Sequence, residues 1–142
     1  MKMMKNAMVL AIMVGVCLFS ASCKKGGDIS TSANVTNEQY SWGTYRADFD
    51  STMFQLDKAV RNACARARLV KREHSFSGNL SFYKYQDVDG VEVKITIYEM
   101  KEGGIRMKIR IGSMGDKESS QKLLMAIDDE LRLLITAPAA AM

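Results

Sequence analysis

The stretch Val91–Ile111 reads VEVKITIYEMKEGGIRMKIRI and decides the fold. In both of its halves apolar residues alternate with polar or charged ones, and Met100–Gly104 separates the halves. A period of two places successive side chains on opposite faces of a β-strand. The stretch therefore predicts a β-hairpin with an apolar face that has to be covered and a basic face that meets water.

Two segments with helical spacing lie on either side of the strand region and are expected to cover the apolar face. The first follows the capping side chains of Asp50–Thr52 and carries an apolar stripe up to Ala67. The second follows the N-cap candidate Asp116 and ends near Ile135. Cys64 falls in the first stripe, which favours a buried small hydrophobe over a reactive thiol.

The other strands are expected at Tyr40–Phe49, Leu69–Phe76 and Leu80–Gln86. Together with the two strands of the hairpin they make a sheet, and the connections are short enough for antiparallel neighbours. The predicted fold class is α+β: an antiparallel sheet of about five strands with two amphipathic helices packed on one face, in the order β-α-β-β-β-β-α.

Two registers compete for the strand Leu80–Gln86. A two-residue turn at Asp89–Gly90 would place Lys84 opposite Ile95 on the apolar face, whereas a three-residue loop places Tyr83 there. A slip of one residue reverses every side chain, so burial favours the second register. This register leaves Phe82 exposed beside Lys84 on the polar face.

Length and charge restrict the class of protein. The chain has 142 residues, which suits one domain, and a formal charge of +4. Removal of Lys2 and Lys5 with a leader would leave +2. Nucleic-acid binders usually concentrate far more positive charge, so nucleic acid is not an expected partner. The sequence leaves the oligomeric state open.

The N-terminus predicts a secretory signal peptide. Met1–Lys5 is basic, and Ala7–Ala21 is an almost unbroken apolar run of 15 residues. A permanent membrane span needs about 20 apolar residues, so an uncleaved anchor is the less favoured alternative. The small residues Ser20–Ser22 complete the pattern of a cleavage site.

The residues Ser20-Ala21-Ser22-Cys23 resemble the processing site of bacterial lipoproteins, although Ser20 stands where those proteins usually have leucine. The resemblance implies cleavage before Cys23 and acylation of Cys23, including palmitate. Attachment by more than one acyl chain makes such an anchor stable. Cleavage without lipidation, which would give a soluble periplasmic protein, is the alternative.

The resemblance also implies a location in the bacterial cell envelope. Lys24 differs from the aspartate that some bacteria use to retain lipoproteins in the inner membrane, which favours the outer membrane, with the domain facing the periplasm. The segment Lys24–Glu38 is polar and is expected to be a flexible tether. The chain thus divides into a signal peptide (1–22), a lipidated cysteine with its tether (23–39), a single α+β domain (40–136) and a disordered tail (137–142).

The basic face of the sheet is the candidate binding surface. With the hairpin loop centred near Glu102, Tyr98 lies opposite Arg106 in a cation–π geometry, and Lys94 lies opposite Arg110 as an unfavourable like-charge pair. The candidate anion- or ligand-binding residues are Lys84, Lys94, Arg106, Lys108, Arg110, Phe82 and Tyr98. A face rich in Lys and Arg also discourages edge-to-edge aggregation, which is the alternative interpretation.

No catalytic or metal-binding pattern is present. His74 is the only histidine, and it has no other ligand at a spacing that suits a metal. The acidic residues of the domain read as turn, cap and helix-surface positions, whereas acid–base catalysis needs convergent groups with tuned pKa values. We expect no enzymatic activity, no cofactor and no metal site.

The segment Ile109–Asp116, IRIGSMGD, resembles the I-R-x-G-x-x-G-D motif that precedes the last helix in a family of small bacterial lipoproteins of unknown function. The similarity covers roughly Thr44–Leu134 and implies a periplasmic or outer-membrane-facing α+β domain without known catalytic residues. The motif glycines suit a turn and Asp116 suits a helix cap. A ligand pocket at that helix N-terminus is the alternative.

The expected function is that of a lipid-anchored cell-envelope protein with an interaction or structural role. Its expected partners are the membrane, through the N-terminal anchor, and another envelope protein or an anionic polymer. The alternative is a ligand-binding module that uses the basic face for anionic envelope components.

Overall fold

The computed structural model describes residues 34–137. The predictions for the signal peptide, for Cys23, for most of the tether and for residues 138–142 lie outside the described residues. The elements are β1 (Val35–Ser41), β2 (Thr44–Phe49), α1 (Met53–Arg66), β3 (Val70–Ser77), β4 (Leu80–Gln86), β5 (Glu92–Glu99), β6 (Ile105–Ile111) and α2 (Lys117–Thr136).

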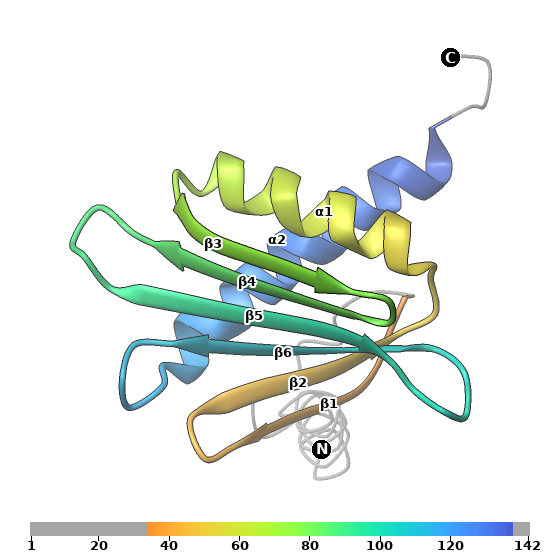
Figure 1. The fold of residues 1–142 in the computed structure, drawn as a ribbon, viewed down its shortest axis with the longest axis horizontal. Helices are drawn as coiled ribbons and strands as arrows, with labels where there is room; N and C mark the ends of the chain where they lie inside the picture. Colours follow the sequence, from red (N-terminus) through yellow and green to blue (C-terminus); the bar gives the residue numbers. More distant parts are fainter. Residues whose placement is uncertain (1–33, 138–142) are drawn as a thin grey trace, which may run out of the picture. The chain divides into compact units, whose positions relative to one another are not determined.

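The strands form one six-stranded antiparallel sheet in the order β1-β2-β6-β5-β4-β3, and both helices lie on one face of it (Figure 1). The predicted α+β class is confirmed. Ile95 and Ile109 are 0% and 1% exposed, and the stripes of the helices meet them with Leu56 and Leu124, which are fully buried. The apolar residues of β5 and β6 alternate with polar ones because only the face under the helices forms the core.

The predicted pairings of the central strands are confirmed. Tyr83 pairs with Ile95, and Tyr98 pairs with Arg106. In the loop between β4 and β5, Gly90 has a φ of +84°, and Asp87 Oδ1 accepts hydrogen bonds from the backbone N–H groups of Asp89 and Val91. The three-residue loop is thus stabilised by one glycine and one aspartate side chain.

The start of the domain differs from the prediction. A turn at Trp42 and Gly43, both with positive φ (51° and 74°), divides the expected single strand into the hairpin of β1 and β2. β1 begins at Val35, inside the predicted tether. The sheet therefore has six strands rather than about five, in the element order β-β-α-β-β-β-β-α. β1 is a polar edge strand, so it has no apolar alternation that the sequence could show.

Both edge strands are irregular. The pairing of β1 with β2 shifts between Thr36 and Gln39, and that of β3 with β4 shifts between Lys71 and Glu73. Every residue of β3 is exposed. Bulges and charges of this kind are common at the edges of natural sheets.

Side chains of the predicted types cap both helices. Thr52 and Gln55 form a capping box at the start of α1, and Asp116 accepts the backbone N–H of Ser119 at 3.0 Å at the start of α2. Cys64 is fully buried on α1, and burial raises the pKa of its thiol to about 12. The thiol therefore stays protonated at neutral pH, which agrees with a packing role.

A polar network joins α1 to the β3–β4 hairpin. The hydroxyl of Tyr83 donates a hydrogen bond to Asp57, which also pairs with Arg61 at 3.1 Å. The ring of His74 stacks on Tyr83 with 4.3 Å between centroids. Burial and the bond to Asp57 raise the pKa of Tyr83 to about 12. The only histidine of the chain thus packs against the edge of the core.

Candidate functional site

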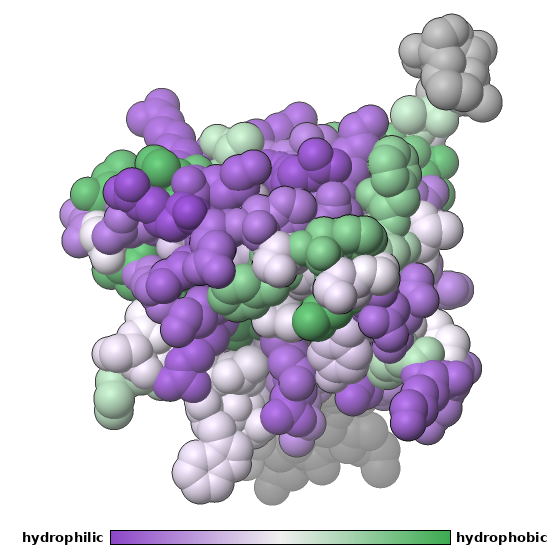
Figure 2. Space-filling view, in the orientation of Figure 1, coloured by the Kyte–Doolittle hydropathy of each residue, from purple (hydrophilic) through white to green (hydrophobic). Residues whose placement is uncertain are grey.

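All seven candidate residues lie on the sheet face that the helices leave uncovered, which we call the outer face. It is turned toward the reader in Figures 1 and 2, and Figure 2 shows that hydrophilic residues predominate there, with small apolar patches between them. The register places Lys84, Lys94 and Arg110 in one row across β4, β5 and β6. Neighbouring strands are about 4.8 Å apart, so three cationic side chains start within about 10 Å.

An open hollow of about 180 Å³ lies on the outer face. Its lining residues are Thr44, Phe82, Lys94, Thr96, Lys108 and Arg110. Phe82 is half-buried in this lining rather than exposed as predicted, because the flanking strands of the twisted sheet shield it. The hollow combines one aromatic surface, two hydroxyl-bearing side chains and three cations. Such a lining suits an anionic group attached to a flat apolar moiety.

Arg106 has a different role from the predicted one. Its Nε and Nη2 atoms donate to the two carboxylate oxygens of Asp48 at 2.6 and 2.9 Å. The guanidinium holds the pKa of the buried Asp48 carboxyl below its usual value. The cation above the ring of Tyr98 is Lys108, whose Nζ lies 5.1 Å from the ring centroid, and not Arg106 as predicted. Arg106 is held by an acid from the neighbouring β2 strand.

Two further cations share one acid. Glu92 pairs with Lys84 at 2.9 Å and with Lys94 at 2.8 Å. These hydrogen bonds lower the pKa of Glu92 and raise that of Lys84. The pairing relieves part of the repulsion along the row of Lys84, Lys94 and Arg110, and it leaves the row with a net positive charge.

On β2 and β6, the outer-face cations without a carboxylate partner among residues 34–137 are Arg46, Lys108 and Arg110. Arg46 pairs directly with Lys108 in the register of β2 and β6, and its Nε is buried without a hydrogen-bond partner. Arg46 was not among the residues predicted for this face. Its alternation with Tyr45 and Ala47 gave it the correct face, but its position beside Lys108 requires knowledge that β2 pairs with β6.

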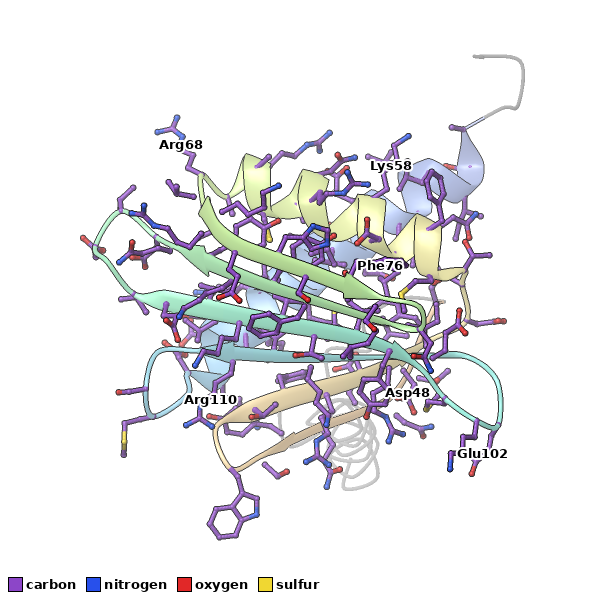
Figure 3. All side chains as sticks on the ribbon, in the orientation of Figure 1. Asp48, Lys58, Arg68, Phe76, Glu102 and Arg110 are labelled. Atoms are coloured by element: carbon purple, nitrogen blue, oxygen red, sulfur yellow. The ribbon has the colours of Figure 1, made fainter. Side chains whose placement is uncertain are left out.

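Arg110 joins the two loops at one end of the sheet. Its Nη1 donates to the carbonyl of Trp42 at 2.9 Å, and its Nη2 donates to the carbonyl of Ser113 at 2.5 Å. Figure 3 shows Arg110 toward this end of the sheet and Glu102 at the opposite end. The arginine of the IRIGSMGD motif thus fixes the β1–β2 turn against the loop that precedes α2.

The glycines of the motif have a packing role in addition to the predicted turn. Gly112 and Gly115 have φ values of +74° and +81°. A Cβ atom at Gly115 would lie 2.2 Å from the carbonyl oxygen of Gly43, so the two loops touch backbone to backbone. The carboxylate of Asp116 accepts the N–H and the hydroxyl of Ser119, which lowers the pKa of Asp116. The cap therefore occupies the place that an anion would take at this helix N-terminus.

Other kinds of site receive no structural support from the described residues. Residues 34–137 bring together no group of three or more His, Cys, Asp or Glu side chains that could hold a metal ion. Neither α1 nor α2 combines the length and the apolar character that crossing a bilayer requires. The outer face and the loops next to it remain the candidate site.

Comparison with protein families gives a match, whereas comparison with curated proteins does not. A family model matches residues 5–130 and thus includes the apolar run Ala7–Ala21, the sheet and most of α2. The chain belongs to the family that is described as protein of unknown function, DUF3568.

Proposed function

We propose that the chain is a lipid-anchored protein of the bacterial cell envelope, with a binding rather than a catalytic role. The basic start, the apolar run Ala7–Ala21 and the small residues before Cys23 support export and lipidation. The anchor belongs to the outer membrane and the domain faces the periplasm, because Lys24 differs from an inner-membrane retention signal. The membrane is then the first partner of the chain.

The outer face binds anionic groups of envelope components, such as the phosphates or carboxylates of a polymer. One observation carries this proposal: Lys108 and Arg110 line the hollow, Arg46 pairs with Lys108 across β2 and β6, and none of the three has a carboxylate partner among the described residues. Like charges on adjacent strands repel each other and destabilise a sheet. A bound anion would reduce this repulsion between the cations. Phe82 and Thr96 supply a floor for the uncharged part of the ligand.

Labelled palmitate tests the anchor. The full chain, expressed in a bacterium that lipidates proteins, is expected to incorporate the label, and Cys23→Ser is expected to abolish incorporation. Cys64→Ala is the matched control, because Cys64 is buried and should not affect labelling. Equal labelling of the chain with and without Cys23 would refute the lipoprotein assignment.

Binding to inorganic polyphosphate and to polygalacturonate, with neutral dextran as the blank, tests the outer face. Lys108→Glu is expected to weaken polyanion binding roughly tenfold or more, because the change removes one favourable charge and adds one unfavourable charge. Lys58→Glu is the control, since this exposed lysine on α1 makes the same change in net charge away from the face. Equal weakening by both substitutions would indicate a non-specific charge effect and would overturn the proposed face.

A further inference from the structure

Two large apolar side chains are exposed on adjoining loops, at the end of the sheet where β1 turns into β2 and β6 leads into α2. Trp42 is 94% exposed and Met114 is 86% exposed. The carbonyl of Met114 lies 2.5 Å from the position that a Cβ of Gly43 would occupy, so the residue after Trp42 touches Met114. We call Trp42 and Met114 the apolar tip.

The apolar tip is held rigidly, although it contributes no burial to the core. Trp42 has a φ of +51°, a conformation that costs energy for any residue with a Cβ atom. Arg110 holds the carbonyls on both loops, and the backbone contact of Gly43 with Gly115 leaves no room for a side chain between them. The arginine and the second glycine of the IRIGSMGD motif therefore hold the backbone of the two loops that carry the exposed tryptophan and methionine. Strained positions of this kind cluster at functional sites.

We propose that the apolar tip docks onto the surface of an anionic lipid bilayer. Tryptophan favours the membrane–water interface because its ring is apolar and its N–H remains hydrated. The guanidinium of Arg110 donates to the Trp42 carbonyl, and an open hollow beside it is lined by Val91, Lys94 and Arg110 together with the single acid Glu92, which leaves a net positive charge. In a bilayer, the apolar side chains would contact the acyl chains while the neighbouring cations contact the anionic head groups.

The position of the tether allows this docking. Val35 begins β1 at the end opposite to Trp42, so the distance from Val35 to the apolar tip is about the length of β1. Eleven residues lie between Cys23 and Val35, and this stretch can span up to about 40 Å when extended, whereas the seven residues of β1 cover about 23 Å. The anchor of the proposed function and the apolar tip can therefore contact one bilayer. The anchor would raise the local concentration of the tip, but docking itself does not require lipidation.

Fluorescence of the full chain in vesicles tests this inference, because Trp42 is the only tryptophan of the sequence. The chain is reconstituted by detergent removal into vesicles of phosphatidylcholine and phosphatidylglycerol in equal parts, with brominated acyl chains as quencher. We expect emission at shorter wavelength than in detergent-free buffer, quenching by the brominated chains and protection from aqueous acrylamide. Vesicles of phosphatidylcholine alone, or added salt, are expected to reduce the quenching.

Two substitutions give the test its specificity. Met114→Glu is expected to lose most of the quenching, because it places a charge at the tip. Phe54→Glu is the control, since Phe54 is 72% exposed on α1 and lies at the opposite end of the sheet from Trp42. Quenching that persists in Cys23→Ser supports docking whatever the palmitate experiment shows. Unquenched emission in both kinds of vesicle would overturn the inference, as would a lipid-independent shift that grows with protein concentration, which would indicate a second copy as the partner.

Discussion

The two faces of β5 and β6 carry the same backbone pairing and opposite chemistry. On the inner face Ile95 pairs with Ile109, and both are buried. On the outer face the neighbouring positions pair Lys94 with Arg110, two like charges. Folding requires the first pair, because it builds the core. Folding does not require the second pair, and like charges directly opposite each other are unfavourable. The difference supports the proposed binding role of the outer face, because stability alone does not account for this like-charge pair.

The largest difference in stability between the two faces is expected for substitutions of two adjacent residues on β5. Ile95→Ala removes a fully buried side chain and is expected to lower the free energy of unfolding by about 3 kcal/mol. Thr96→Ala, the next residue on the outer face, is expected to change it by less than about 1 kcal/mol. Urea unfolding followed by circular dichroism measures both values. Similar losses for the two variants would show that the faces do not differ in this way.

Substitution of two glycines separates the energetic cost of a positive φ from the cost of a close backbone contact. Gly103→Ala meets no atom within 4 Å and should cost about 1–2 kcal/mol for its positive φ alone. Gly115→Ala has a similar φ and also meets the backbone of Gly43, so we expect a further loss of about 1–3 kcal/mol. The difference between the two free energies of unfolding measures the contact between the loops. A value near zero would mean that the loops separate without cost.

The ion pair of Asp48 and Arg106 is the exception on the outer face, because stability does depend on it. Arg106→Ala leaves a carboxylate that is 5% exposed without its main partner, and we expect a loss of about 2 kcal/mol. Lys122→Ala removes an ion pair of similar length between two exposed side chains and should have no measurable effect. Equal effects of the two substitutions in urea unfolding would contradict the role of burial.

The same pair predicts a dependence of stability on acid. The folded state lowers the pKa of Asp48, so its contribution is complete above the usual carboxyl pKa of about 4 and is lost as pH falls through the lower native value. Asp48→Asn should therefore flatten the acid end of the curve of stability against pH. An unchanged acid limb would assign the loss to other carboxyl groups.

The smallest effect is expected for Lys108, a residue that we assign to binding. Lys108→Ala removes a cation–π contact with Tyr98 and should cost less than about 1 kcal/mol of stability. Thermal unfolding of the variant checks this value. Together with the polyanion measurements, a small loss of stability with a large loss of binding would sharpen the contrast between the faces, whereas a large loss of stability would remove it.

Local patterns allowed much of the fold to be predicted. Strict alternation identified β5 and β6, and the requirement that Tyr83 rather than Lys84 be buried gave the correct register of β4. β1 escaped prediction because its edge position leaves most of its residues exposed, so its composition resembles that of a linker. Tertiary position decided its structure, and no local pattern carries that information.

The candidate site was predictable to the extent that it depends on neighbouring strands in the sequence. The row of Lys84, Lys94 and Arg110 follows from two hairpins. The partner of Arg106 could not be predicted in this way, because Asp48 is 58 residues away in the sequence and reaches Arg106 only through the pairing of β2 with β6. The ring of Tyr98 lies near the diagonal neighbour Lys108 instead of the directly opposed Arg106, which is already held by Asp48.

The irregular edges of the sheet have a consequence for molecules that gather at high density. A regular edge strand offers a row of unpaired N–H and C=O groups to the next molecule, which is the first step toward a fibril. The shift near Lys71 and the shift near Thr36 interrupt that row on both sides. Copies of the chain at high density can therefore touch each other without forming a continuous intermolecular β-sheet.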